Sequence, residues 1–155
     1  MNLRYEIADL YEGPNAVIYT VKTIDDEDSE FDKFQNDPEN TADPHFQDIL
    51  YRLINIADLH GCRDDFFKPE STRDKAIFAL YHSDSDLRLY CIKYRLTLLI
   101  VGCGGVKSTR TYQEDPHLNH CVETLEDFWE RFDPLVRSGE IEIDSKGRLS
   151  GPRKI

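Results

Sequence analysis

The sequence predicts a single α+β domain over residues 1–155, in which helices pack on one antiparallel β-sheet. Three observations favour this fold class. The length suits one domain with a substantial core. Segments rich in β-branched and aromatic residues occur in a pair near the N-terminus and again in the middle of the chain. Two stretches with helical spacing of apolar residues begin at an Asp-Pro dipeptide.

The strand predictions rest on residue type and alternation; in 87–94, Leu87, Leu89 and Cys91 are expected on one face and Arg88, Tyr90 and Ile92 on the other. Gly13-Pro14 lies between the first two strands and predicts a hairpin over residues 1–24, an addition to the central sheet. The central sheet is predicted within residues 76–112, and its most apolar strand ends at Gly102. The predicted strands cover residues 3–11, 16–24, 76–82, 87–94 and 96–102.

The helix predictions rest on capping residues and apolar spacing. A short helix is expected to begin at Ser29, with Phe31 and Phe34 on one face. A longer one is predicted over 44–61, with Asp43 as its N-cap and Gly61 as its end. The apolar residues of this longer helix are Phe46, Ile49, Leu50, Leu53, Ile54 and Ala57.

The C-terminal part repeats the Asp-Pro device. Asp115 caps a predicted helix over 116–137, which Pro134 is expected to end or kink. Residues 140–155 are predicted to form a small hairpin around Lys146-Gly147 or a loose tail.

The charge of the chain is uneven. The formal net charge of -11 is unlike that of a general nucleic-acid binder. Residues 1–66 carry a net charge of -11, residues 67–115 carry +2, and residues 116–155 carry -2. No apolar run approaches a membrane span and no signal peptide is visible, so a cytoplasmic protein without membrane contact is expected.

The four cysteines lie far apart, and no C-x-x-C pair occurs. This spacing favours reduced, buried thiols and predicts neither a zinc site nor a cofactor. The histidines are interpreted as surface residues that do not cluster with cysteines or acids. The residues concerned are Cys62, Cys91, Cys103, Cys121, His82, His117 and His120.

The stretch LLIVGCGGVKSTRTYQEDP, residues 98–116, resembles a phosphate-binding loop, because an apolar run is followed by glycines and by Lys107-Ser108. A P-loop needs glycine before its lysine, and Val106 stands there instead. A dinucleotide-binding loop needs a third glycine where Lys107 stands. Gly104-Gly105 is therefore interpreted as a bulge or turn that leaves the central strand.

The polar residues after these glycines suggest a different chemistry. If the segment stays extended, Arg110, Tyr112 and Glu114 share one face. Arg88 and Lys93 on the neighbouring strand could join the same sheet. Such a set suits cleavage of RNA without a metal, in which the 2′-hydroxyl attacks the adjacent phosphate. The plainer interpretation, exposed polar residues on a strand and its connector, stays open.

The segments AIFALY, LRLYCIKY and TLLIVGCGGVKSTRTY, within residues 76–112, resemble the three core strands of the RelE/HigB superfamily of bacterial toxins. Residues 76–125 also resemble RelE-like proteins from Bacteroidetes genomes. The resemblance implies a RelE/ParE-like fold and a metal-independent endoribonuclease that acts on mRNA. It implies catalytic roles for Arg88, Lys107, Arg110 and Tyr112. The residues expected to contact RNA are Lys93, Arg95, Gln113 and Glu114.

The resemblance also implies partners. A toxin of this kind would act on mRNA at the ribosome and would pair with an antitoxin, expected to be a helix-turn-helix protein. The chain is longer and more acidic than the typical family member. A second hypothesis is therefore a non-catalytic protein of the same fold, whose acidic N-terminal part binds a protein partner.

Overall fold

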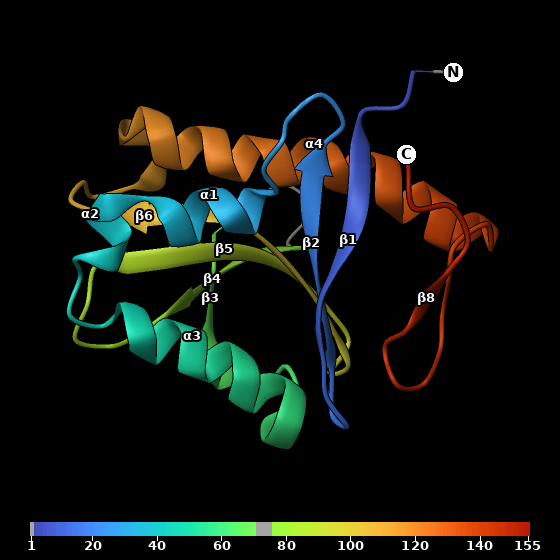
Figure 1. Ribbon diagram of the computed structural model, residues 1–155, viewed down its shortest axis with the longest axis horizontal. Coiled ribbons are helices and arrows are strands. Elements are labelled where there is room, and N and C mark those ends of the chain that lie inside the picture. The colour runs from blue at the N-terminus through green and yellow to red at the C-terminus, as the bar shows by residue number, and fades with distance from the viewer. Residues whose placement is uncertain (1, 71–75) are drawn as a thin grey trace.

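The computed structural model describes residues 2–70 and 76–155. A six-stranded sheet lies at the centre, with α4 on one face and α3 and the apolar side of α1 on the other (Figure 1). The helices are α1 (Glu30–Asn36), α2 (Pro38–Thr41), α3 (Phe46–Asn55), a π-helical turn η1 (Ile56–His60), the 3₁₀ turns η2 (Asp64–Phe66) and η3 (Tyr112–Glu114), and α4 (Pro116–Ser138). The strands are β1 (Tyr5–Glu12), β2 (Val17–Thr23), β3 (Phe67–Pro69), β4 (Ile77–Tyr81), β5 (Leu87–Tyr94), β6 (Leu98–Val106), β7 (Glu142–Ile143) and β8 (Leu149–Ser150). The predicted single α+β domain is confirmed.

The sheet is mixed, which corrects the expectation of an antiparallel one. Its strand order is β1-β2-β6-β5-β4-β3, and β2 pairs with β6 in parallel. The N-terminal hairpin is therefore an integral part of the central sheet. Thr20 fixes the junction, since its buried hydroxyl donates a hydrogen bond of 2.7 Å to the Val101 carbonyl. Residues 17–21 of β2 are buried, as expected of a strand covered on both faces.

The two faces of the sheet hold separate apolar clusters. The predicted alternation along β5 is confirmed: Leu89 and Cys91 face α3, whereas Tyr90 and Ile92 face α4. Cys91 and Cys103 consequently lie on opposite faces, although their strands are neighbours. All four cysteines are buried and free.

The helices on the α3 side begin close to the predicted positions. Ser29 caps α1 with a full capping box, because its hydroxyl accepts from the Asp32 amide and the Asp32 carboxylate accepts from the Ser29 amide. Helix α3 begins at Phe46, two residues later than predicted. The Asp43 side chain instead accepts from the His45 amide and closes a turn before the helix.

Helix α4 confirms one boundary and corrects another. The Asp115 carboxylate accepts from the amides of His117 and Leu118, at 2.9 and 3.1 Å, and so caps the helix as predicted. Pro134 does not end the helix, which continues to Gly139 at φ 83°. Pro134 lies on the exposed side, where solvent can satisfy the carbonyl that loses its helical partner.

Strand β6 explains the glycine-rich stretch. It continues to Val106, four residues beyond the predicted end, with a register shift opposite Tyr90. A Cβ at Gly104 would lie 1.9 Å from the Arg88 carbonyl oxygen, and one at Gly105 would lie 3.2 Å from the His117 ring. The glycines therefore let β5 and the first turn of α4 approach β6. The expected bulge or turn at Gly104-Gly105 is wrong, because these two residues pair in register with Leu89 and Arg88 and the irregular pairing lies at Gly102 and Cys103.

The C-terminal segment forms the predicted hairpin, β7 and β8, around Gly147 at φ 94°. The Leu149 amide donates to the Tyr19 hydroxyl at 2.9 Å, and Ile155 forms backbone hydrogen bonds with Tyr5 in β1.

Within residues 2–70 and 76–155, no helix is both long enough and apolar enough to cross a membrane.

Candidate functional site

Arg88, the proposed phosphate-binding residue, is buried, with 9% of its surface exposed. Its guanidinium donates to the backbone carbonyls of Ser85 and Leu87, at 2.9 and 3.1 Å, and lies over the Tyr81 ring. Its Nε has no hydrogen-bond partner among the described residues. In this conformation Arg88 supports the β4–β5 turn and presents little charge to a ligand.

The segment after β6 is not extended, which corrects the expected shared face. Tyr112 begins the 3₁₀ turn η3, and its buried ring packs edge-on against Tyr90 at 6.1 Å between centroids. Arg110, Gln113 and Glu114 are exposed. The structure therefore separates Tyr112, a core residue, from the polar residues expected beside it.

Lys93 and Arg95 lie away from the others. Lys93 is five residues from Arg88 on one strand, so the two side chains point to opposite faces of the sheet. Lys93 forms an ion pair with Asp64. Arg95 lies at the β5–β6 turn with φ 59°, at the far end of β5 from Arg88.

Sequence reasoning missed Glu70, a residue that interacts electrostatically with Arg88 and Lys107. Burial raises the pKa of Glu70, and the positive charges of Lys107, Arg88 and Lys68 oppose that shift. A half-buried carboxyl beside cations has the electrostatic surroundings of a proton-transfer group. No sequence pattern marks Glu70, because only the fold brings its carboxyl near Arg88 and Lys107.

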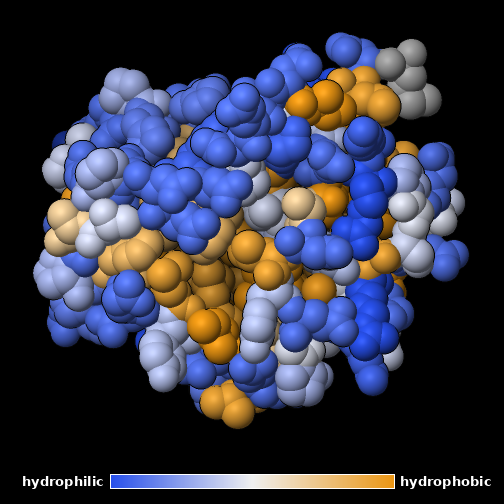
Figure 2. Space-filling model, in the orientation of Figure 1, coloured by the Kyte–Doolittle hydropathy of each residue, from blue (hydrophilic) through white to orange (hydrophobic). Residues whose placement is uncertain are grey.

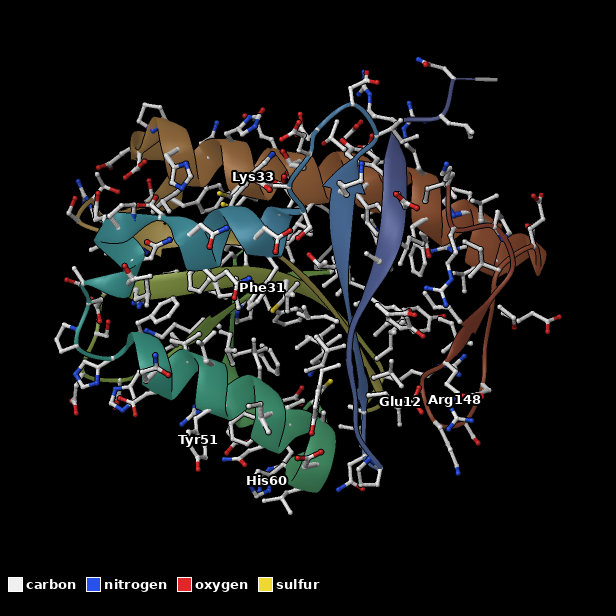
Figure 3. The ribbon with its side chains drawn as sticks, in the orientation of Figure 1. Glu12, Phe31, Lys33, Tyr51, His60 and Arg148 are labelled. Atoms are coloured by element: carbon white, nitrogen blue, oxygen red, sulfur yellow. The ribbon has the colours of Figure 1, made fainter. Side chains whose placement is uncertain are left out.

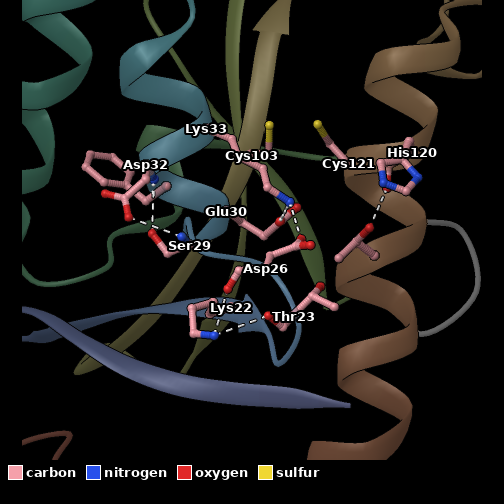
Figure 4. A network of polar contacts seen from close by, with 12 residues as sticks. Lys22, Thr23, Asp26, Ser29, Glu30, Asp32, Lys33, Cys103, His120 and Cys121 are labelled. Atoms are coloured by element: carbon pink, nitrogen blue, oxygen red, sulfur yellow. Dashed lines mark hydrogen bonds and ion pairs between the residues drawn. The ribbon is translucent and has the colours of Figure 1, made fainter.

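A second group, here called the thiol–imidazole cluster, consists of Cys103, His117 and Cys121. One sulfur or nitrogen atom from each lies within 4.8 Å of the others. The His117 Nε2 is 3.9 Å from the Cys103 sulfur and 3.8 Å from the Cys121 sulfur. Figure 4 shows the two thiols directed toward each other from β6 and α4. This grouping corrects the expectation that His117 lies apart from cysteines.

The cluster shifts the titration of its members. A hydrogen bond from Cys121 and the neighbouring His117 outweigh burial and lower the pKa of Cys103 to about 6. The hydrogen bond with Cys103, opposed by burial and aided by the Gly104 carbonyl, raises the pKa of His117 to about 9. The hydrogen bond to Cys103 and burial raise the pKa of Cys121. Both shifts favour the charged pair, a Cys103 thiolate beside a protonated His117.

Local structure holds the cluster in place. The Asp115 cap fixes the first turn of α4, so His117 and Cys121, four residues apart, lie on one helix face. Gly105 leaves room for the His117 ring, whose Nε2 also lies 3.0 Å from the Gly104 carbonyl oxygen. The H-x-x-x-C spacing after an Asp-Pro cap was a sequence signal for this pair, but Cys103 could be added only by the fold.

A surface group corrects the expectation that His82 does not cluster with acids. The rings of His45 and His82 stack at 4.3 Å between centroids. Asp48 lies 2.9 Å from His45 Nδ1 and 3.9 Å from His82 Nε2. Among the described residues, this group and the thiol–imidazole cluster are the two places where potential metal-binding atoms of three residues come close together. His120 belongs to neither group.

An apolar groove opens between α1 and α3, beside the β1–β2 hairpin, and appears in Figure 2 as an orange area bordered by blue. A β-bulge in β1 turns the consecutive residues Leu10 and Tyr11 toward it. Ile54 lines the groove with 45% of its surface exposed, whereas Tyr51 on the same helix is exposed but does not line the groove (Figure 3). The lining residues are Leu10, Tyr11, Ile18, Phe31, Gln35, Leu50, Leu53 and Ile54.

The elements that build this groove are acidic, and their cations are occupied. Lys22 donates to three backbone carbonyls. Lys33 pairs with Asp26 and Glu30 at 2.8 and 2.7 Å. Arg52 lies over the Phe66 ring. The acids on β1, α1, α3 and η1 are Glu6, Asp9, Glu12, Glu30, Asp32, Asp48 and Asp58.

Comparison with known proteins found no matching family model, no similar curated protein and no similar solved structure.

Proposed function

We propose that this protein is a protein-binding module that receives an amphipathic segment of another protein in the groove between α1 and α3. The observation that carries the proposal is an exposed apolar groove whose lining comes entirely from residues 10–54. These residues belong to the part of the chain, 1–66, that has a net charge of -11. The expected partner segment has an apolar face flanked by lysine or arginine residues.

The apolar lining supplies the affinity in this proposal. Each large side chain fully removed from water contributes about 1.5–3 kcal/mol. Ile54 and Tyr11 remain substantially exposed on the free chain, so a partner could cover them. Isolated exposed apolar residues are ordinary, but these two line a concave surface with further apolar groups inside it.

The surrounding charge selects the partner. The groove elements carry more acids than bases, and Lys22, Lys33 and Arg52 are engaged within the chain. Three of the acids, Asp9, Glu12 and Glu30, are paired with Arg153, Arg148 and Lys33. A basic segment would approach faster and bind more tightly than an acidic one, with an advantage that falls as salt rises. A second copy of the chain would present the same acidic surface, so self-association through this face is disfavoured.

The ribonuclease hypothesis stays a prediction. Arg88 and Lys107 lie near Glu70, but Arg88 and Tyr112 are buried and Lys93 and Arg95 lie elsewhere. Its test is inducible expression in a bacterial host, with growth and transcript integrity compared between the wild type and Arg110→Ala. Growth arrest with cleaved transcripts, lost in Arg110→Ala, would support the nuclease over the binding module.

The direct test of the binding module uses two synthetic helical peptides with the same leucine face. One carries lysines on its flanks and the other carries glutamates. Fluorescence anisotropy measures their binding to the wild type, to Ile54→Asp and to the control Leu96→Asp. Leu96 is 60% exposed at the β5–β6 turn, far along the chain from the groove lining.

We expect the lysine peptide to bind and the glutamate peptide to bind much more weakly. Ile54→Asp should weaken the lysine peptide about fivefold, since about 1 kcal/mol of apolar burial is lost. Leu96→Asp should change nothing. Equal binding of both peptides, or equal effects of the two substitutions, would contradict the proposal.

A further inference from the structure

We propose that Cys103, His117 and Cys121 bind one Zn²⁺ ion through two thiolates and one imidazole, with the fourth coordination position open to water. The three residues come from two elements, β6 and the first turns of α4, that are packed together in the core. Nothing in the proposed partner binding requires this site.

The spacing of the ligand atoms already fits tetrahedral zinc. Zn–S bonds of about 2.3 Å and Zn–N bonds of about 2.0–2.1 Å place sulfur and nitrogen roughly 3.6 Å apart. The observed distances from His117 Nε2 to the two sulfurs are 3.9 and 3.8 Å. Zinc binding therefore contracts the two nitrogen–sulfur distances by a few tenths of an ångström. The two sulfurs lie within 4.8 Å of each other, against roughly 3.8 Å across a tetrahedral Zn²⁺, so their distance contracts by at most about 1 Å.

The donor set selects the metal class. Two thiolates and an imidazole are typical ligands for zinc, whereas magnesium and calcium prefer oxygen ligands. The surface group His45, Asp48 and His82 offers nitrogen and oxygen without sulfur. The two groups can therefore be told apart by whether sulfur coordinates a spectroscopic probe metal.

The surroundings suit a cation. The side chains of Cys103 and Cys121 are buried, and His117 is exposed, so an ion would reach the cluster past the imidazole. Glu30 is buried and interacts electrostatically with both thiols (Figure 4). Its carboxylate pairs with Lys33, which fixes it near the cluster. A bound dication would compensate two thiolates beside this carboxylate.

The rigidity of the three positions favours binding. The capped first turn of α4 presents His117 and Cys121 together, and Cys103 is held between Val101 and Gly104, which both pair with β5. The His117 Nε2 would exchange its contact with the Gly104 carbonyl for the metal. A preformed cluster has little conformational entropy to lose when the ion arrives.

The experiment titrates the reduced full-length chain with Co²⁺ under anaerobic conditions and then displaces Co²⁺ with Zn²⁺. The variants are Cys103→Ser, Cys121→Ser and His117→Ala. The matched control is Cys91→Ser, which removes a buried thiol from the opposite face of the sheet. Absorption reports tetrahedral Co²⁺ and thiolate-to-cobalt charge transfer, and circular dichroism checks that each variant is folded.

We expect one Co²⁺ per chain with a charge-transfer band that Zn²⁺ abolishes. Each cluster variant should weaken binding by more than the 10–100-fold typical of losing a residue outside the ligand set. Cys91→Ser should bind as the wild type does. Absence of the thiolate band, retention of it in both cysteine variants, or Zn²⁺ bound only through His45 and His82 would overturn the proposal.

Discussion

Substitution of Gly104 by alanine tests the role assigned to the glycine-rich end of β6. The new Cβ would lie 1.9 Å from the Arg88 carbonyl oxygen, and no Cβ contact is closer than about 3.0 Å in practice. Backbone atoms of β5 or β6 would have to separate by about 1.1 Å. Both strands lie at the centre of the sheet, and Gly104 pairs directly with Leu89. Separating the strands at this point would therefore weaken the hydrogen bonds between them.

The expected cost is large. Overpacking typically costs about 1–3 kcal/mol, and each weakened backbone hydrogen bond adds about 1 kcal/mol. We expect a loss of about 3 kcal/mol or more, a substantial part of the ~5–15 kcal/mol that stabilises a typical domain. Urea denaturation followed by circular dichroism measures it, with the m value as a check on two-state unfolding.

Gly139→Ala is the control. Gly139 has φ 83° but no atom within 4 Å of its would-be Cβ, so only backbone strain of about 1–2 kcal/mol is expected. An insoluble Gly104→Ala beside a soluble Gly139→Ala would agree with this ranking. Equal or smaller destabilisation in Gly104→Ala would refute the steric account of the glycine stretch.

Three further substitutions test individual contacts. The buried Tyr90 hydroxyl has no hydrogen-bond partner among the described residues, so Tyr90→Phe should raise the free energy of unfolding in urea by about 1 kcal/mol. A lower free energy of unfolding in Tyr90→Phe would contradict this. Asp115→Ala removes the cap of α4 and should cost about 1 kcal/mol in the same assay. Burial opposes the shift, but hydrogen bonds from Tyr5 and Arg4 lower the pKa of Asp127. The ionised Asp127 therefore stabilises the fold above the unfolded-state pKa near 3.9, and this contribution is lost as pH falls through the lower folded-state pKa. The difference in unfolding free energy between wild type and Asp127→Asn should shrink on acidification, and a constant difference would refute this.

Local features of the fold could be predicted from the sequence. Alternation in β5, the Ser29 cap and the Asp115 cap each involve neighbours within four residues, and each prediction is confirmed. The parallel pairing of β2 with β6 joins residues about 80 positions apart, such as Thr20 and Val101. No local preference encodes such a pairing, which depends on burial of both faces of β2.

The candidate sites show the same division. The parity of positions 88 and 93 on one strand was enough to place Arg88 and Lys93 on opposite faces. The i, i+4 pair His117 and Cys121 could likewise be found on the predicted helix. Cys103 joins them only because β6 runs on past Gly102 and packs under α4. The predicted end of that strand was wrong, so the cluster could not be assembled from the sequence.

Helix α1 connects the groove and the thiol–imidazole cluster. Phe31 lines the groove, while Glu30, the preceding residue, interacts electrostatically with Cys103 and Cys121. The helix has seven residues and a capping box at Ser29, so we expect it to shift as a unit. If both proposals hold, occupancy of either site changes α1, and thermodynamic linkage makes the effect reciprocal. Zn²⁺ should then change the affinity of the lysine peptide in the wild type but not in Cys121→Ser. Equal peptide affinities with and without Zn²⁺ in the wild type would show that α1 separates the two sites rather than coupling them.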